Sequence, residues 1–179
     1  MKFIIALCVG ATLAALPVFA SADDKHSITA SAIVGPQLFE REFSPPATET
    51  IVDSVTFSEQ LGFQYQWTKL LQPSLAVQTN HNVSKEVEEP SRFTSFQIQP
   101  GIAISIGKPF SVGFDAVFAS RVGGENHFGF GIQPRLGLNA KLAGPISFVA
   151  QVQAPLMIIP SASIALTPFV GLGYELYGG

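Results

Sequence analysis

From Phe128 to Leu142 the chain alternates without interruption between apolar residues and small or polar ones. The stretch reads F-G-F-G-I-Q-P-R-L-G-L-N-A-K-L, with an apolar residue at every even-numbered position. Successive side chains of a β-strand point to opposite faces, so a period of two collects the apolar residues on one face. The pattern predicts a strand with one apolar face and one face of small and polar side chains.

The same alternation recurs seven more times along the chain. The apolar faces of the eight predicted strands span residues 28–38, 55–67, 71–77, 96–106, 110–118, 128–142, 146–158 and 164–176. The links 68–70, 107–109 and 143–145 are short, whereas 40–50, 84–92 and 121–127 are longer and charged or glycine-rich. Only 160–162 is short where a long link is expected. This alternation of short and long links predicts an all-β, eight-stranded antiparallel up-and-down transmembrane β-barrel.

The N-terminus has the features of an export signal. A positive start, an apolar run over residues 3–16 and the small residues Ala20-Ser21-Ala22 predict a cleaved signal peptide, residues 1–22, before a barrel domain, residues 23–179. An uncleaved transmembrane helix is the alternative, but Pro17 interrupts a run shorter than the roughly 20 residues that a span needs. Because the single cysteine, Cys8, lies in the predicted signal, we expect no disulfide in the mature chain.

Charge and hydropathy narrow the classes of partner. Without Lys2, nine basic residues face thirteen acidic ones, which gives the mature chain a net charge of −4 and makes nucleic acid an unsuitable partner. Mean hydropathy is positive although the mature chain has no apolar run long enough for a membrane helix. Alternating strands whose apolar faces meet lipid account for both facts. The rival architecture is a soluble lipocalin-like barrel, which would turn its apolar faces inward.

The strand and link pattern resembles the small OmpA/OmpX-type outer-membrane barrels. The resemblance implies short periplasmic turns, external loops and an outer-membrane location. It also implies contacts with outer-membrane lipid and lipopolysaccharide, help from barrel-assembly machinery, and a monomer. Gly171, Tyr174 and Leu176 have the spacing of the Gly-x-x-aromatic-x-hydrophobic assembly signal of such proteins, but Gly178-Gly179 stand where a terminal aromatic residue is usual.

Two sets of residues are predicted to mark the edges of the lipid band. Every tyrosine and the only tryptophan end strands at the proposed periplasmic side, as an interfacial girdle would: Tyr65, Trp67, Tyr174 and Tyr177. The alternative is that these rings fill a soluble β core. Six residues at a common depth are predicted to mark the outer rim, where water or a bulge can satisfy a broken ladder: Pro36, Glu59, Pro100, Pro134, Pro155 and Pro168. The alternative is a set of unrelated kinks.

The inward faces predict a plugged lumen. They carry glutamines (Gln64, Gln66, Gln72, Gln99, Gln133, Gln151 and Gln153) and few charges (Asp115, Arg135, Lys141 and Glu175). Side chains fill an eight-stranded barrel, and charges in a dry interior need partners, so we expect a hydrogen-bonded polar cluster. A gated ion path is the alternative.

Signals for catalysis are weak. His81 faces outward near the outer rim, and Ser84 and Ser120 are the nearest hydroxyls by height, which would suit a general base beside a nucleophile. The sequence shows no acid to pair with His81, no metal-ligand spacing and no cofactor motif. We therefore expect a non-enzymatic outer-membrane barrel with a structural or surface-interaction role, adhesion-like in character. The alternatives are a lipid A-modifying enzyme (deacylase or acyltransferase) and a narrow pore.

Overall fold

The computed structural model describes residues 27–43, 50–51, 56–68, 70–82, 94–122, 128–159 and 162–178. The predicted signal peptide and most of the three predicted long loops lie outside these residues. The strands are β1 (Ser27–Gln37), β2 (Phe39–Phe43), β3 (Thr50–Ile51), β4 (Thr56–Gln66), β5 (Leu71–Asn82), β6 (Thr94–Gly107), β7 (Phe110–Val122), β8 (Phe128–Ala143), β9 (Ile146–Gln153), β10 (Leu156–Ile159) and β11 (Ala162–Gly178). The described residues contain no helix long and apolar enough to cross a membrane.

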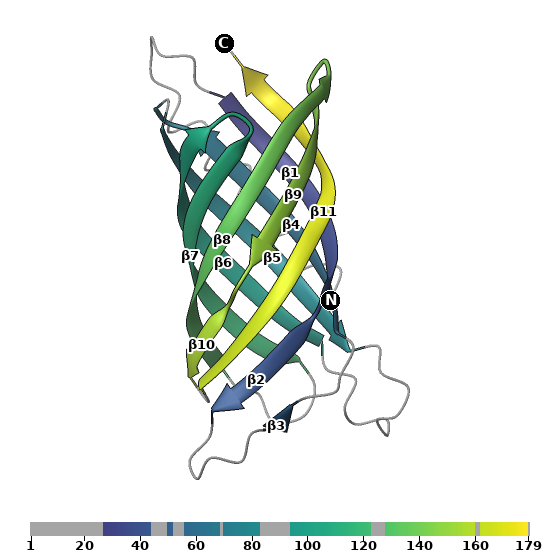
Figure 1. Ribbon diagram of the computed structural model, residues 1–179, viewed down its shortest axis with the longest axis vertical. Helices are drawn as coiled ribbons and strands as arrows, with labels where there is room; N and C mark the ends of the chain where they lie inside the picture. Colours follow the sequence, from purple (N-terminus) through teal and green to yellow (C-terminus); the bar gives the residue numbers. More distant parts are fainter. Residues whose placement is uncertain are drawn as a thin grey trace.

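These strands form one closed antiparallel barrel (Figure 1). β1 and β2 together make the first barrel strand, β9 and β10 make the seventh, and pairing of β1 with β11 closes the cylinder. The predicted eight-stranded all-β barrel is therefore confirmed. The first barrel strand reaches Phe43, so it runs into the segment 40–50 that was expected to be a loop.

The two ends of the barrel differ. The links β4–β5, β6–β7 and β8–β9 lie at one end, which we call the turn end, together with the C-terminus (Figure 1). β2, β3 and β10 lie at the opposite end, which we call the loop end (Figure 1). As expected, the link between β10 and β11 is short although it lies at the loop end, with β10 ending at Ile159 and β11 beginning at Ala162.

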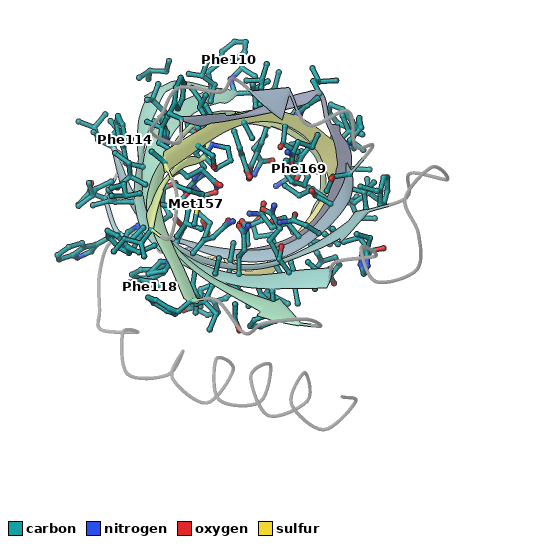
Figure 2. The ribbon with its side chains drawn as sticks, turned by 90° about the horizontal axis from the view of Figure 1, so that it is seen from below. Phe110, Phe114, Phe118, Met157 and Phe169 are labelled. Carbon is teal, nitrogen blue, oxygen red and sulfur yellow. The ribbon has the colours of Figure 1, made fainter. Side chains whose placement is uncertain are left out.

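The apolar faces of the strands form the outside of the barrel. Phe114, Leu136 and Leu172 are 59%, 59% and 57% exposed. Figure 2 shows Phe110, Phe114 and Phe118 pointing away from the barrel, while polar side chains and Phe169 point inward. The predicted direction of the apolar faces is confirmed, and the inverted arrangement of a soluble lipocalin-like barrel is not the one observed.

The seam between β1 and β11 is interrupted where two prolines meet. The regular ladder runs as far as Val34 and Val170, and pairing resumes at Phe39 and Leu166 after a change of register. Pro36 and Pro168 both lie in this interval, and neither has an N–H to donate. A Cβ atom at Gly35 would lie only 1.8 Å from the Pro168 carbonyl oxygen, so only glycine fits this close approach.

The second interruption, at Ala154 and Pro155 between β9 and β10, leaves the register unchanged. Gln153 pairs with Arg135 and Leu156 pairs with Ile132, as an unbroken strand would. The Pro155 carbonyl still accepts from the Ala165 N–H at 3.1 Å. The missing proline donor therefore opens the ladder locally without shifting the strands.

Candidate functional site

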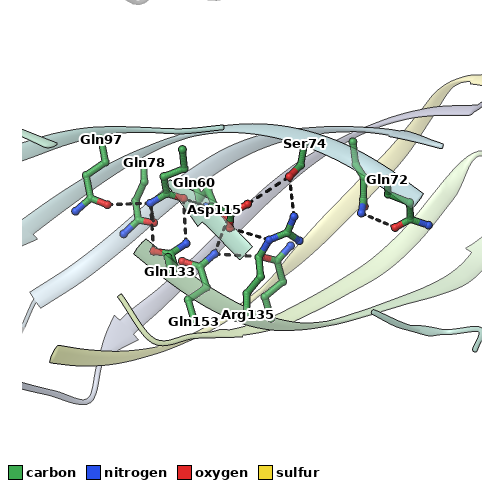
Figure 3. Close-up of polar contacts among 12 residues, drawn as sticks. Gln60, Gln72, Ser74, Gln78, Gln97, Asp115, Gln133, Arg135 and Gln153 are labelled. Atoms are coloured by element: carbon green, nitrogen blue, oxygen red, sulfur yellow. Dashed lines mark hydrogen bonds and ion pairs between the residues drawn. The ribbon is translucent and has the colours of Figure 1, made fainter. Parts of the chain in front are cut away.

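Six glutamines meet inside the barrel, and we call them the amide layer: Gln60, Gln78, Gln97, Gln99, Gln133 and Gln153. Period-two alternation brings each of them inward, from β4, β5, β6, β8 and β9. Their side chains are between 0% and 9% exposed, with Gln99 and Gln133 at 0%. Figure 3 shows their amide groups converging across the lumen.

Gln99 is the centre of the amide layer. Its Nε2 donates to Gln97 Oε1 at 2.8 Å and to Gln78 Oε1 at 3.0 Å. Its Oε1 accepts from Gln60 Nε2 at 2.6 Å and from Gln133 Nε2 at 3.2 Å. Because buried amides are costly unless they are hydrogen-bonded, these contacts let four strands place polar groups on the axis of the barrel.

One hydrogen bond of the amide layer connects strands on opposite sides of the barrel. Gln153 Nε2, on β9, donates to Gln60 Oε1, on β4, at 3.0 Å. β1 and β11 separate these two strands in the wall, so this bond spans the interior and does not follow the sheet. At the height of the amide layer, side chains therefore fill the cross-section.

A buried ion pair lies against the amide layer on its turn-end side. Arg135 Nε contacts Asp115 Oδ2 at 2.8 Å, and the two side chains are 7% and 4% exposed. Arg135 Nη2 donates to Ser74 Oγ at 2.7 Å, and Ser74 Oγ donates to Asp115 Oδ1 at 3.3 Å (Figure 3). A Cβ atom at Gly101 would come within 1.7 Å of the carboxylate, so glycine at this position leaves space for the ion pair.

The four charges predicted for the lumen form two separate pairs. Lys141 Nζ lies 3.5 Å from Glu175 Oε2, and these side chains are 70% and 34% exposed. Lys141 and Glu175 lie in the turn-end parts of β8 and β11, and both are nearer the turn end of the barrel than Arg135 is. The buried pair and the exposed pair therefore sit in very different dielectric surroundings.

A cavity of about 30 Å³ adjoins the ion pair. Its walls include Ser31, Gln60, Ser74, Asp115 and Arg135. This volume and its polar lining suit about two water molecules. The lumen is thus dry at the amide layer and able to hold water directly beside it.

Apolar side chains also point into the barrel, and three of them pack together. Ile33, Val149 and Phe169 are 2%, 4% and 1% exposed and form a small cluster on β1, β9 and β11. The cluster lies on the inner side of the wall that contains the interrupted seam. Apolar packing therefore fills part of the lumen where the backbone ladder is weakest.

The outer face of the described strands carries an acid–base pair. His81 Nε2 lies 4.0 Å from Glu59 Oε2, and the side chains are 41% and 59% exposed. Of the two candidate hydroxyls, Ser84 lies outside the described residues. Ser120 is on β7, with Phe96 of β6 between it and the strand of His81. The structure thus supplies an acid for His81 that the sequence did not reveal, and it does not bring Ser120 to it.

The residues predicted to mark the rims face outward or end strands, except Pro155, which lies between β9 and β10 at a position in register with the inward-facing Gln133. Tyr65 and Tyr177 both pair with Ile28 of β1, and Tyr174 is on the same strand as Tyr177, so the three tyrosines share the turn end of β4 and β11. Trp67 directly follows β4 and is 54% exposed. Of the rim prolines, Pro36, Pro134, Pro155 and Pro168 lie on the consecutive barrel strands β8 to β1, and Pro100 lies apart on β6. Their positions relative to lipid stay a prediction.

The proposed assembly signal lies on the last strand. Tyr174 and Leu176 point outward and are 51% and 48% exposed. Gly171 packs closely against β1, since a Cβ there would lie 2.1 Å from the Ala32 carbonyl oxygen. The role of these residues in assembly stays a prediction.

Some interior residues escaped the sequence analysis. Gln60, Gln78, Gln97 and Ser74 were not recognised, although the alternation that located Gln64 and Gln99 also places them inward. Ile33, Val149 and Phe169 were missed because an apolar residue on an inward position looks, in sequence, like a local break in the pattern. The hydroxyl of Ser74 completes the ion-pair cluster and has no sequence signal of its own.

Comparison with solved structures shows the fold of small outer-membrane barrels. The chain is similar to the outer membrane protein OprG of Pseudomonas aeruginosa (8% identity, 89% of this chain and 99% of that chain, TM-score 0.55). It is also similar to Neisserial surface protein A (12% identity, 87% and 100%, TM-score 0.55) and to Ail, the attachment invasion locus protein of Yersinia pestis (14% identity, 87% and 100%, TM-score 0.52). No family model and no curated protein sequence matches the chain. The expected resemblance to small eight-stranded outer-membrane barrels is confirmed at the level of the fold.

Proposed function

We propose that the chain is an integral outer-membrane β-barrel without enzymatic activity, whose lumen is plugged and whose outer surface carries its function. The observation that carries this proposal is the apolar outside of the closed barrel, from Phe110 and Phe114 on β7 to Leu172 on β11. A soluble monomer rarely exposes a continuous apolar surface on this scale. A lipid bilayer accepts it, because closure leaves no unpaired strand edge in the hydrocarbon.

The interior supports a structural role. The amide layer and the ion pair of Asp115 with Arg135 occupy the lumen at mid-height, with hydrogen bonds between strands on opposite sides. Such contacts stabilise a barrel from within, since polar groups in a dry interior are costly unless paired. With its centre filled, the protein presents its wall and its strand ends to the surroundings.

The turn end is proposed to face the periplasm and the loop end the cell exterior. Short turns lie on the periplasmic side of outer-membrane barrels, and the exposed rings of Trp67, Tyr174 and Tyr177 suit a membrane–water interface. The barrel-assembly machinery would read β11 during insertion, through Gly171, Tyr174 and Leu176. The inserted protein would act as a monomer surrounded by outer-membrane lipid.

The loops set the chemistry of surface contacts. Carboxylates outnumber basic residues near the loop end: Glu40 and Glu42 lie on β2, Glu49 and Asp53 follow it in sequence, and Glu86, Glu88 and Glu89 belong to the second predicted long loop. Carboxylates bind divalent cations, which also bind the phosphates of lipopolysaccharide. We therefore propose a surface-interaction role in which cations bridge these loops to anionic lipid headgroups.

Membrane fractionation tests the membrane part of this proposal. Protein exported with its own signal should be recovered with outer membranes and should require detergent for extraction. It should also migrate differently on gels before and after boiling, because a folded barrel resists unheated detergent. Recovery of the folded protein in the aqueous fraction would contradict the proposal.

A lipid-modifying enzyme is the second candidate, and the pair of His81 with Glu59 favours it. A carboxylate 4.0 Å from an imidazole can hold it in the orientation of a general base, and both side chains are open to the outer face. Mass spectrometry of lipid A from cells that produce the parent, His81→Ala or Glu59→Gln would decide between the candidates. Identical lipid A in all three strains, matching cells without the protein, supports the non-enzymatic barrel, whereas a change that requires His81 supports the enzyme.

A further inference from the structure

The lumen is closed at the amide layer, and inward positions on its loop-end side, such as Ser58 and Ser163 at 0% and 8% exposed, are buried as well. Gln99, Gln133 and Gln153 are 0%, 0% and 1% exposed, whereas the inward-facing Ser31, Ser74 and Gln151 nearer the turn end are partly exposed. The cavity of about 30 Å³ lies between these two levels. Water can thus reach the lumen from the turn end up to the ion pair, and the amide layer stops it there.

Most inward positions on either side of the amide layer carry small side chains. On the turn-end side they are Thr29, Ser31, Gly62, Ser111, Gly113, Gly137, Ser147 and Gly173, and on the loop-end side they are Gly35, Ser58, Ser95, Ala119, Gly129, Gly131 and Ser163. Gln64 and Gln72 are large, but they bond to each other along one wall at 2.6 Å. Larger apolar side chains also face inward, and Phe169 packs with Ile33 and Val149 along one wall. The side-chain hydrogen bonds described above between strands that are not neighbours all lie in the layer and its adjoining ion pair.

The bonding within the amide layer can rearrange. Gln99 Nε2 has two hydrogens but three acceptors within reach, namely Gln97, Gln78 and Gln133, the last at 3.5 Å. Gln153 Oε1 is buried with no hydrogen-bond partner among the described residues. A shift of one amide can therefore exchange one acceptor for another at little net cost.

The absence of net charge at the amide layer determines which solutes could pass it. All members of the amide layer are neutral, and the adjoining Asp115 and Arg135 cancel each other at 2.8 Å. An ion would exchange its hydration shell for uncharged amides in a narrow, partly dry space, which is unfavourable. A small neutral molecule with carbonyl and amide groups could instead replace amide–amide bonds one for one.

We propose that the amide layer is a side-chain gate that closes a latent pore, and that the solutes suited to this pore are small, uncharged hydrogen-bonding molecules. This inference rests on the proposed function, because it requires a barrel that spans a membrane. The gate needs no movement of the backbone, since side chains alone make up the layer, with Gln99 and Gln133 among its most buried members.

Permeation through reconstituted barrels tests the gate. Phosphatidylcholine vesicles carrying the parent protein, Gln99→Ala/Gln133→Ala or the control Gln64→Ala/Gln72→Ala would be diluted into isotonic urea, and swelling would be followed by light scattering. The control removes the same number of amides from the barrel wall on the turn-end side of the amide layer. We expect vesicles with Gln99→Ala/Gln133→Ala to swell at least tenfold faster than the other two, with a smaller increase in potassium chloride conductance.

Each result of the permeation experiment tests a different claim. Swelling of the Gln99→Ala/Gln133→Ala vesicles no faster than that of the parent, with the variant shown to be folded by its heat-modifiable migration, overturns the gate. An increase in ion conductance without an increase in urea entry overturns the proposed solute class. Failure of the parent itself to enter vesicles would instead contradict the proposed function.

Cysteine labelling provides a second test that leaves the amide layer intact. The one cysteine of the sequence, Cys8, lies in the predicted signal peptide, so in a chain that begins at Asp23 the variants Ser31→Cys and Ser95→Cys place single thiols on the two sides of the layer. In vesicles of defined barrel orientation, a charged, membrane-impermeant thiol reagent should reach residue 31 only from the turn end and residue 95 only from the loop end. Labelling of both from one end would overturn the gate.

Discussion

Replacing Arg135 with methionine should strongly destabilise the barrel. Methionine keeps the length of the side chain but removes the partner of Asp115, whose carboxylate is 4% exposed. Ser74 also loses the Arg135 donor at 2.7 Å, while its hydroxyl still donates to Asp115. The buried carboxylate then has only neutral hydrogen-bond donors in place of a charge.

The size of the expected loss in unfolding free energy follows from the burial of the ion pair. Breaking a buried ion pair by removing one partner costs about 3–5 kcal/mol, because the remaining charge is uncompensated. Lys141 and Glu175 provide the matched control, since Lys141 is 70% exposed and an exposed pair is worth about 0.2–1 kcal/mol. Asp115→Asn/Arg135→Met should recover much of the loss, because a neutral pair leaves no charge in the interior.

Urea unfolding of the barrel in lipid vesicles, followed by tryptophan fluorescence and by gel migration, measures these differences. Trp67 lies outside the lumen and is unchanged in every variant, so it reports unfolding alone. If Arg135→Met lowers the free energy of unfolding no more than Lys141→Met does, the interior at this height is hydrated. The argument from a dry amide layer then fails.

Three further predictions concern the wall and the apolar interior. Phe114→Arg, near mid-height on β7, should cost about 2–4 kcal/mol in vesicles and Phe110→Arg at the turn end about 0–1 kcal/mol, so equal costs in urea unfolding would refute the proposed position of the membrane. Gly35→Ala should reduce the folded fraction on unheated gels, because its methyl group would lie 1.8 Å from a backbone oxygen of β11. Gly137→Ala should have a milder effect, because its methyl group would meet a serine side chain at 2.7 Å. Equal effects of the two substitutions would count against a backbone clash. Phe169→Ala should cost about 3–5 kcal/mol in the same unfolding assay, since the ring is 1% exposed, and a loss below 1 kcal/mol would show that it packs loosely.

The fold was predictable because it depends on one repeated local rule. Alternation fixes which face of each strand is apolar, and short links fix which strands are neighbours, so the barrel and the outward direction of Phe114 or Leu172 followed from sequence. The position of the first loop was less predictable. Glu40 and Glu42 look like loop residues, yet β2 continues through them because β11 offers a paired edge.

The interior was only partly predictable for a physical reason. Alternation shows that Asp115, Arg135, Lys141 and Glu175 face inward, but their pairing depends on the relative height of strands that are far apart in sequence. The pairing of His81 with Glu59 has the same origin, because β4 and β5 bring the two side chains together through their register. Which residue touches which across the lumen needs the shear of the closed barrel, which no single strand records.

The interrupted seam has a consequence for the order in which the protein comes apart and forms. The β1–β11 contact joins the two ends of the polypeptide, so it carries the greatest chain-entropy penalty of any pairing in the cylinder. Pro36 and Pro168 withhold two amide donors from this same junction. Mechanical or chemical stress should therefore unzip the wall first along this line, and during biogenesis its closure should be the last event.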